Sequence, residues 1–274
     1  MIEKGISGEH IDEKLAKNIM LEILVEFDRY CKQHDLTYFL GYGTLLGAIR
    51  HNGFIPWDND IDVVMLRDDY NKLRQLLVIE PISANLHALD YRFEKTFPFL
   101  KITDVRTVVR EKYLETENNL GLYIDVFPLD IIPDDPKLIK KIQKKCFLLY
   151  KLYAFTSYRF GTGKNLVKKM FKFLLFPLRL FVNQQRVCKM LDFFYTTLPV
   201  NCSSKLINLV WGLPDDRDVY DITWYHDVIS VSFEGYNFNA PNQYDLILKQ
   251  QYGDYLKLPP VSERFTHDYN AIWK

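Results

Sequence analysis

The sequence predicts an α/β fold in which helices flank a mixed β-sheet and a basic helical insertion interrupts the chain. Apolar residues that recur every four positions near the start predict a helix, and short β-rich segments between Gly and Pro turns predict strands. The insertion is predicted by the segregation of basic residues between Lys137 and Lys189. A hydrophobic fraction of 48% and an aromatic fraction of 15% are typical of a folded globular chain.

The N-terminal half alternates between predicted helices and strands. Ile11, Ile19 and Phe27 belong to an apolar stripe that predicts a helix ending near His34. Further helices are predicted at 44–50, with Thr44 as the N-cap, and at 69–79. β-rich composition predicts strands at 37–40, 60–65, 91–93, 101–104, 107–110 and 121–129.

Three parts of the chain are distinguished by composition. Residues 1–135 form the predicted catalytic core, 136–200 the basic helical insertion, and 201–274 a loop-rich return segment that completes the core. The four cysteines are widely spread and include no C-x-x-C pair, which argues against a zinc site and a disulfide framework. With no signal-peptide pattern and no apolar stretch of about 18 residues, the sequence predicts a cytoplasmic protein.

The insertion is strongly basic. Residues 137–189 contain 14 Lys or Arg and no Asp or Glu. Within them, residues 167–179 mix cations with large apolar groups, and the sequence predicts peripheral contact of residues 137–189 with the anionic inner face of a membrane. The alternative is an ordinary helical subdomain whose cations face water or pair with the acidic core, and Pro177 interrupts any single helix.

Three acids carry the predicted chemistry. In a strand, Asp60 and Asp62 point to the same side with Cα atoms about 6.6 Å apart. Two such carboxylates repel each other unless a cation lies between them, and Mg²⁺ (or Mn²⁺) binds carboxylates together with substrate phosphates. Asp125, between Ile and Val in a second apolar strand, completes the set, unless it pairs with an Arg or caps a loop.

Two neighbouring patterns complete this interpretation. An EF-hand calcium loop is excluded because Val63 stands where Gly is required and Asp69 where Glu is required. The turn with Gly41 and Gly43 leads into a helix, and such a turn lets backbone N–H groups approach a phosphate.

Three segments resemble one known family, the LicD/fukutin family, whose members have a nucleotidyltransferase fold. The segments are FLGYGTLLGAIRHNGFIPWDNDIDVVM (39–65), LYIDVFPLD (122–130) and FEGYNFNAPNQYDLILKQQYGDYLKLPP (233–260), followed by His267. The resemblance implies a metal-dependent enzyme that transfers phosphocholine from CDP-choline to a sugar hydroxyl of a teichoic acid or lipopolysaccharide precursor. Transfer of another phosphopolyol (ribitol or glycerol phosphate) from a CDP donor is the first alternative.

The resemblance also implies roles for individual residues. Asp60, Asp62 and Asp125 would hold Mg²⁺, and Asp125 would act as the base in preference to His267. Lys101 would contact the α-phosphate, unless it is an ordinary surface lysine. The implied substrate-binding residues are Gly41, Gly43, Thr44, Arg50, Trp57, Asp58, Lys101 and His267.

Three further expectations follow. A choline headgroup would need an aromatic cage, for which the candidates are Trp57, Trp211, Trp224 and Tyr225. The basic insertion also fits a nucleotidyltransferase acting on nucleic acid, but the motifs resemble the LicD group specifically, so nucleic acid is not the expected partner. A binding protein with a decayed site is the non-enzyme alternative, and it is disfavoured because all three acids are present.

Overall fold

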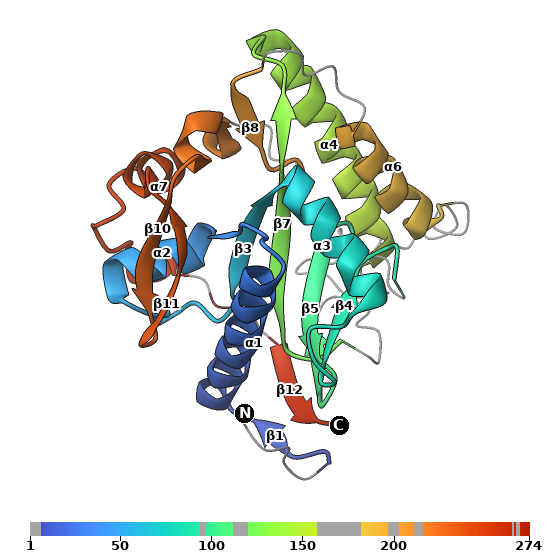
Figure 1. Cartoon of the computed structure of the whole chain (residues 1–274), viewed down its shortest axis with the longest axis vertical. Helices are drawn as coiled ribbons and strands as arrows, with labels where there is room; N and C mark the ends of the chain where they lie inside the picture. Colours follow the sequence, from blue (N-terminus) through green and yellow to red (C-terminus); the bar gives the residue numbers. More distant parts are fainter. Residues whose placement is uncertain are drawn as a thin grey trace.

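The computed structural model describes residues 7–93, 97–111, 120–157, 182–196, 203–210, 216–264, 266 and 269–274, which form an α/β fold (Figure 1). The α-helices are α1 (Glu13–Gln33), α2 (Tyr42–His51), α3 (Arg67–Ile79), α4 (Pro136–Ser157), α6 (Gln184–Thr196) and α7 (Tyr244–Tyr252). The strands are β1 (His10–Ile11), β2 (Phe39–Leu40), β3 (Asp62–Leu66), β4 (Leu86–Leu89), β5 (Leu100–Asp104), β6 (Thr107–Glu111), β7 (Tyr123–Ile132), β8 (Lys205–Ile207), β9 (Val219–Asp221), β10 (Val228–Phe233), β11 (Tyr236–Pro241) and β12 (Tyr269–Trp273). Short 3₁₀ turns are η1 (Asp216–Asp218), η2 (Ile222–Tyr225) and η3 (Val261–Glu263).

The largest sheet is mixed and is centred on β7. Its strand order is β2-β3-β7-β5-β4, and β8 and β9 extend it from the far end of β7. β3 and β7 run parallel, whereas the other neighbouring strands pair antiparallel. The parallel pair brings together the two strands that were predicted to carry the acids, so their relative register decides the geometry of the site.

Helix α1 confirms the helix that the apolar stripe predicts, including its end near His34. Asp12 is its N-cap, and the Asp12 carboxylate accepts a hydrogen bond from the Leu15 N–H at 2.7 Å. Ile19, Ile23 and Phe27 are buried on the face that packs toward β5 and β7. Helix α3 and strands β5 and β6 likewise confirm the predictions for 69–79, 101–104 and 107–110.

The strand predicted at 91–93 is wrong. These residues form a turn, because the Asp90 carboxylate accepts hydrogen bonds from the N–H groups of Arg92 at 2.7 Å and Phe93 at 3.3 Å. The edge strand is instead β4, which precedes the turn and pairs with β5. An aspartate that caps its own turn therefore decides the local structure against the β-rich composition that follows it.

The C-terminal part is more regular than the predicted loop-rich segment. β8 pairs with β7, and β12 lies between β1 and β6, so these short strands are stabilised by partners far away in sequence. β10 and β11 form a hairpin whose two turn residues, Glu234 and Gly235, have φ of 50° and 80°. Two positive φ values are what a two-residue hairpin turn requires.

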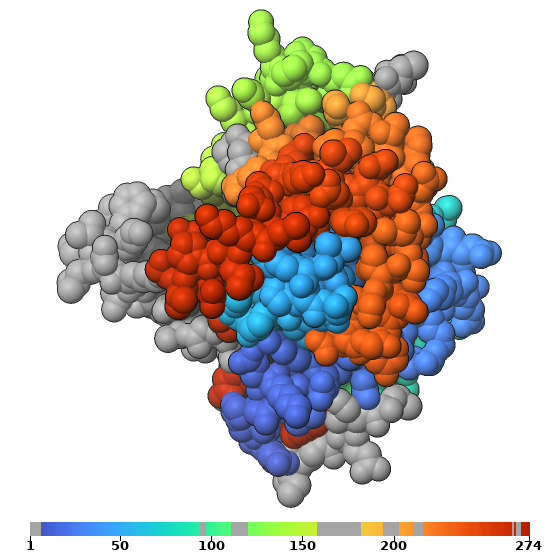
Figure 2. All heavy atoms as spheres, turned by 90° about the vertical axis from the view of Figure 1, so that its left-hand side faces the viewer, coloured from blue at the N-terminus to red at the C-terminus, as the bar shows by residue number. Residues whose placement is uncertain are grey.

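This hairpin closes over the segment between α2 and β3. The Glu234 carboxylate accepts a hydrogen bond from the Phe54 N–H at 2.9 Å, and a Cβ at Gly53 would lie only 2.2 Å from it. Figure 2 shows the light-blue stretch near residue 50 framed by the orange and red C-terminal segments. The C-terminal part thus completes the surroundings of the predicted site.

The basic insertion is described in part. α4 and α6 pack against each other, whereas residues 158–181, and with them the predicted membrane-contact stretch 167–179, lie outside the described residues. None of the described helices is both long and apolar enough to span a bilayer. The division into 1–135, 136–200 and 201–274 stays a prediction.

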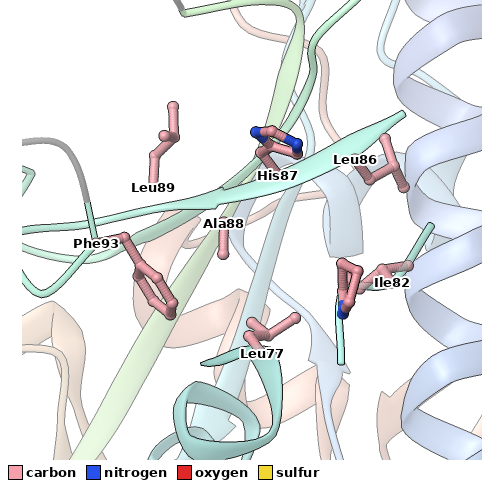
Figure 3. Close-up of a pocket in the computed structure, with 8 residues that line it drawn as sticks. Leu77, Ile82, Leu86, His87, Ala88, Leu89 and Phe93 are labelled. Carbon is pink, nitrogen blue, oxygen red and sulfur yellow. The ribbon is translucent and has the colours of Figure 1, made fainter. Parts of the chain in front are cut away.

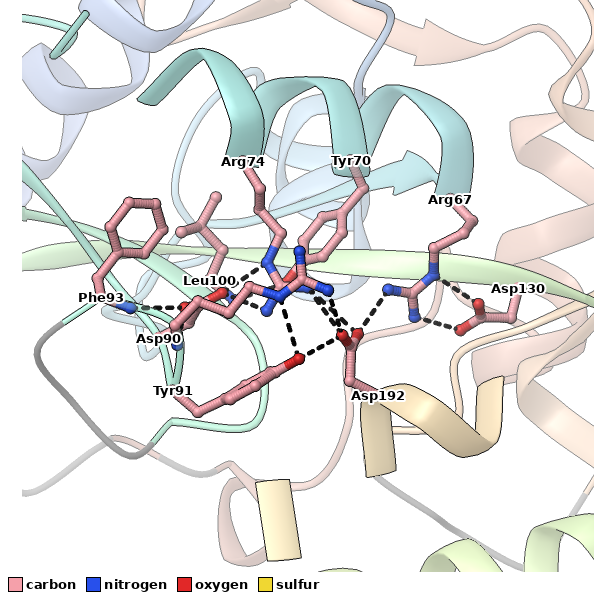
Figure 4. Close-up of polar contacts among 10 residues, drawn as sticks. Arg67, Tyr70, Arg74, Asp90, Tyr91, Phe93, Leu100, Asp130 and Asp192 are labelled. Atoms are coloured by element: carbon pink, nitrogen blue, oxygen red, sulfur yellow. Dashed lines mark hydrogen bonds and ion pairs between the residues drawn. The ribbon is translucent and has the colours of Figure 1, made fainter. Parts of the chain in front are cut away.

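Helix α6 is anchored to the core by the Asp192 carboxylate (Figure 4). It accepts charged hydrogen bonds from Arg67 at 2.9 Å, Arg74 at 3.2 Å and Arg92 at 2.9 Å, and one from the Tyr91 hydroxyl at 2.5 Å. Arg67 and Arg74 also bind Asp130 and Asp90, respectively. Asp192 is the first acid after the acid-free stretch of the insertion, and it fixes the return of the chain to α3.

An apolar pocket of about 400 Å³ lies between the end of α3 and the edge strand β4 (Figure 3). Leu77, Ile82, Leu86 and Phe93 are among the residues that line it. None of the residues predicted to bind substrate or metal lines this pocket.

Candidate active site

Three neighbouring strands place two acids and a lysine in one row across the sheet. Asp62 on β3 lies opposite Asp125 on the parallel strand β7, and Asp125 lies opposite Lys101 on the antiparallel strand β5. All three side chains are partly or fully shielded from solvent, with Lys101 only 6% exposed. The two acidic segments predicted from the sequence are therefore brought together by the parallel β3–β7 register.

Asp62 lies in a cluster of like charges. Its pKa is raised well above the usual value, first by burial and then by the negative charges of Asp60, Asp125 and Asp58, whereas Lys101 lowers it. Asp60 precedes β3, which begins at Asp62, so the strand geometry expected for 60–65 does not extend to Asp60. Among the neighbouring charges, Asp60 nevertheless affects Asp62 most strongly.

Lys101 is paired with Asp125. The distance from Lys101 Nζ to Asp125 Oδ1 is 2.5 Å, and Nζ lies 3.8 Å from the centroid of the Tyr123 ring. The interpretation of Lys101 as an ordinary surface lysine is therefore wrong. The contact of Lys101 with a donor phosphate stays a prediction. Asp125 was alternatively expected to pair with an arginine, and in the structure it pairs with a lysine instead.

The donor chemistry of this cluster fits a hard divalent cation. Several half-buried carboxylates repel one another around Asp62, and a cation among them would relieve that repulsion. Within the part of the chain that the structure describes, no three His, Cys, Asp or Glu side chains are already arranged as metal ligands. The assignment of Mg²⁺ to Asp60, Asp62 and Asp125 thus stays a prediction.

The glycine turn packs directly against β3. The Gly41 N–H donates to the Asp62 carbonyl oxygen at 2.9 Å, and a Cβ at Gly41 would lie 2.9 Å from Val64 Cγ1. A Cβ at Gly43 would lie 2.3 Å from Asp58 Oδ2, so the missing side chain lets the Asp58 carboxylate approach the start of α2. A phosphate was expected to approach the backbone of this turn closely, and in the structure the Asp58 carboxylate makes such an approach at Gly43.

The prediction that Thr44 is the N-cap of α2 is wrong. The N-cap is Gly41, and Thr44 lies inside the helix, where its Oγ1 accepts a hydrogen bond from the Asp62 N–H at 2.8 Å. Helix α2 begins two residues earlier than predicted, which turns the Thr44 hydroxyl toward β3. Thr44 thereby fixes the backbone of Asp62, an acid whose pKa is raised by burial and neighbouring carboxylates.

We expect Thr44→Val to destabilise the protein by about 1–3 kcal/mol, because the buried Asp62 N–H then lacks an acceptor. Thr44→Ser keeps the hydroxyl and is the matched control. The measurement is the free energy of unfolding in urea for both variants. A Val variant as stable as the wild type would show that the hydrogen bond contributes nothing, and a Ser variant less stable than Val would show that the methyl group contributes more than the hydroxyl.

Residues from the C-terminal part surround the acids, and the sequence did not identify them. The Tyr42 hydroxyl accepts from Asn208 Nδ2 at 2.5 Å, and burial together with Asp218 raises its pKa. Tyr252 leaves 45% of its surface exposed, yet burial of its hydroxyl end and the charge of Asp62 raise its pKa. Both phenols therefore stay protonated at neutral pH and can donate hydrogen bonds beside the acids.

Trp57, next to the acidic segment, has two arginines close to its ring. The guanidinium carbon of Arg264 is 4.2 Å from the Trp57 ring centroid, and that of Arg50 is 6.0 Å away. Arg50 Nη1 donates to the Tyr255 carbonyl oxygen at 2.7 Å, and burial lowers its pKa. Arg264 was not predicted, because nothing in its local sequence distinguishes it from other C-terminal cations.

The remaining candidates for the aromatic cage, and His267, are not placed beside the acids by any described contact. Tyr225 is buried and packs against Phe39 and Tyr220, which makes it a core residue. Trp224 contacts the Tyr220 ring. His267 and Trp211 lie outside the described residues.

Comparison with known proteins connects this geometry to one family. Residues 35–160 match the family described as LicD/FKTN/FKRP, nucleotidyltransferase domain. Over 256 residues the chain is 33% identical to the lipopolysaccharide cholinephosphotransferase LicD of Haemophilus influenzae, covering 91% of this chain and 93% of that protein. The chain belongs to the LicD family.

Two further relatives match only parts of the chain. An uncharacterized protein of Rickettsia prowazekii is 25% identical over 145 residues, which is 52% of this chain and 47% of that protein. One of Rickettsia typhi is 33% identical over 67 residues, which is 24% of this chain and 21% of that protein. The family domain contains Asp60, Asp62, Lys101 and Asp125 but ends before the C-terminal residues that surround them.

Proposed function

We propose that this LicD-family transferase moves phosphocholine from CDP-choline to a sugar hydroxyl of a lipid-linked teichoic acid or lipopolysaccharide precursor. The observation that carries the proposal is the 33% identity, over nearly the whole chain, to a lipopolysaccharide cholinephosphotransferase. The row formed by Asp62, Asp125 and Lys101 supports it, because phosphoryl transfer depends on positioning and on charge stabilisation.

In the proposed reaction the acceptor hydroxyl attacks the phosphorus that carries choline. A bond forms from the hydroxyl oxygen to that phosphorus, and the bond from the phosphorus to CMP breaks, so that CMP leaves. The hydroxyl proton goes to the Asp125 carboxylate, which Lys101 holds in place. We assign donor binding to the substrate-binding residues predicted from the sequence other than Lys101: Gly41, Gly43, Thr44, Arg50, Trp57, Asp58 and His267.

The proposal includes Mg²⁺ or Mn²⁺ held by Asp60, Asp62 and Asp125. Such a cation would offset negative charge on the donor phosphates and on the leaving CMP. Lys101, Arg50 and Arg264 would be the protein's own cations around the same charges.

A donor screen tests the proposed substrate. Purified protein with Mg²⁺ and a lipid-linked glycan acceptor is incubated with CDP-choline, CDP-ribitol or CDP-glycerol, and CMP release is measured. We expect release only with CDP-choline. CMP release only with CDP-ribitol or CDP-glycerol would mean that the transferred group is a phosphopolyol and not phosphocholine.

We expect Lys101→Met to lower kcat by about 10- to 100-fold, as loss of an outer-shell partner does in metal sites. The reason is that Asp125 loses the cation that holds it, while the donor still binds. Lys101→Arg keeps the charge and should retain more activity. Steady-state kinetics with varied donor separate the roles: a raised KM with unchanged kcat would contradict this positioning role and favour a phosphate contact.

A further inference from the structure

Helix α4 carries a surface that the proposed reaction does not use. The helix has 22 residues and is about 33 Å long. Its buried side, with Ile139, Ile142 and Cys146, faces the rest of the protein, and α6 packs against it. The opposite side is open to solvent from Lys137 to Leu152.

The solvent side of α4 is densely cationic. At about 100° per residue, eight exposed residues fall within an arc of about 140°. They are Lys137, Lys140, Lys141, Lys144, Lys145, Leu148, Lys151 and Leu152, here called the lysine face. Leu148 lies near the middle of this arc and is 68% exposed.

Several lysines on other helices of the same protein are paired with acids. In α1, Lys17 pairs with Glu13 and Lys32 with Asp28, and in α7 Lys249 pairs with Asp245, each one turn apart. α4 contains no acid at all. Of its lysine face, the following form no ion pair with any described residue: Lys137, Lys140, Lys141, Lys144 and Lys151.

We propose that the lysine face of α4 docks the protein on an anionic bilayer surface. Lysines near such a surface attract its negative headgroups, and their charges add along the helix. The exposed Leu148 and Leu152 distinguish a bilayer from a soluble polyanion, because only a bilayer offers apolar depth to leucines beside the cations. Docking of this kind would be independent of which headgroup the enzyme transfers.

Vesicle co-sedimentation of the full chain tests this surface. Vesicles of phosphatidylcholine are compared with vesicles containing phosphatidylglycerol, at low and high salt. We expect salt-sensitive binding to the anionic vesicles only. Equal binding to both vesicle types, or to neither, would overturn the proposal.

Variants assign the binding to α4. The triple variant Lys140→Gln, Lys144→Gln, Lys151→Gln should bind about a hundredfold more weakly, and Leu148→Ser about tenfold more weakly. The matched control, with the same loss of charge elsewhere, is Lys14→Gln, Lys72→Gln, Lys257→Gln, all of which are exposed. Equal weakening by the control would overturn the assignment to α4, and unchanged binding of Leu148→Ser would overturn the contact of the leucines with the bilayer.

Discussion

Asp62→Asn is expected to lower the rate of phosphocholine transfer by about a thousandfold or more, while the protein stays folded. Asp62 lies opposite Asp125 in the parallel β3–β7 register and among further carboxylates that raise its pKa. A cation bound among these carboxylates would favour the charged form of Asp62, and the carboxylate would in turn hold that cation in place. The amide of Asn has nearly the same shape but lacks that charge.

The stability of the same variant separates a catalytic from a structural role. Burial and neighbouring carboxylates raise the pKa of Asp62, so its charged form at neutral pH costs folding free energy that the neutral Asn does not. We expect Asp62→Asn to unfold at the same temperature as the wild type, or higher, when metal is absent. The measurements are thermal unfolding and CMP release on the same preparations.

A matched control for this prediction is Asp68→Asn. Asp68 is an exposed acid in the first turn of α3, six residues further along the chain. It should retain full activity. If Asp62→Asn also retained near-wild-type transfer with Mg²⁺ and donor present, the three-carboxylate site would be wrong.

The sequence predicts the parts of this site that depend on local pattern. Asp62 and Asp125 each stand in a short apolar β-rich segment, and both segments became neighbouring strands. The glycine turn at the start of α2 was likewise predicted from the sequence. In the structure, a side chain at either glycine would clash with Val64 or with Asp58. What the pattern could not give is the pairing of Lys101 with Asp125, which depends on β5 lying beside β7.

The missed residues share a physical cause. Tyr252 is about 190 positions from Asp62 in sequence, and it approaches the acids only because the C-terminal segments fold back over α2. Asn208 reaches Tyr42 in the same way. Thr44 was misassigned since capping rules consider only its own helix, whereas its hydrogen bond goes to a strand. Such contacts are set by tertiary packing and leave no local periodicity.

Asp192→Ala is expected to destabilise the protein by about 3–5 kcal/mol, the range found when one partner is removed from a buried ion pair. Asp192 is 5% exposed and is shared by Arg67, Arg74 and Arg92. Burial alone would raise its pKa, but Arg74, Arg67 and the Tyr91 hydrogen bond lower it on balance. Truncation leaves the buried Arg74 and Arg67 guanidiniums short of negative charge where α6 meets α3 (Figure 4).

The pH dependence and a matched variant test this explanation. A group with a lowered pKa stabilises the folded state above its unfolded pKa, and that contribution is lost as the pH falls through the folded pKa. The difference in unfolding free energy between wild type and Asp192→Ala should therefore shrink below about pH 4. Arg92→Gln is the control: its side chain is 46% exposed, so its loss should cost about 1 kcal/mol or less. A cost for Asp192→Ala no greater than that of Arg92→Gln would mean that the arginine network does not hold α6 on the core.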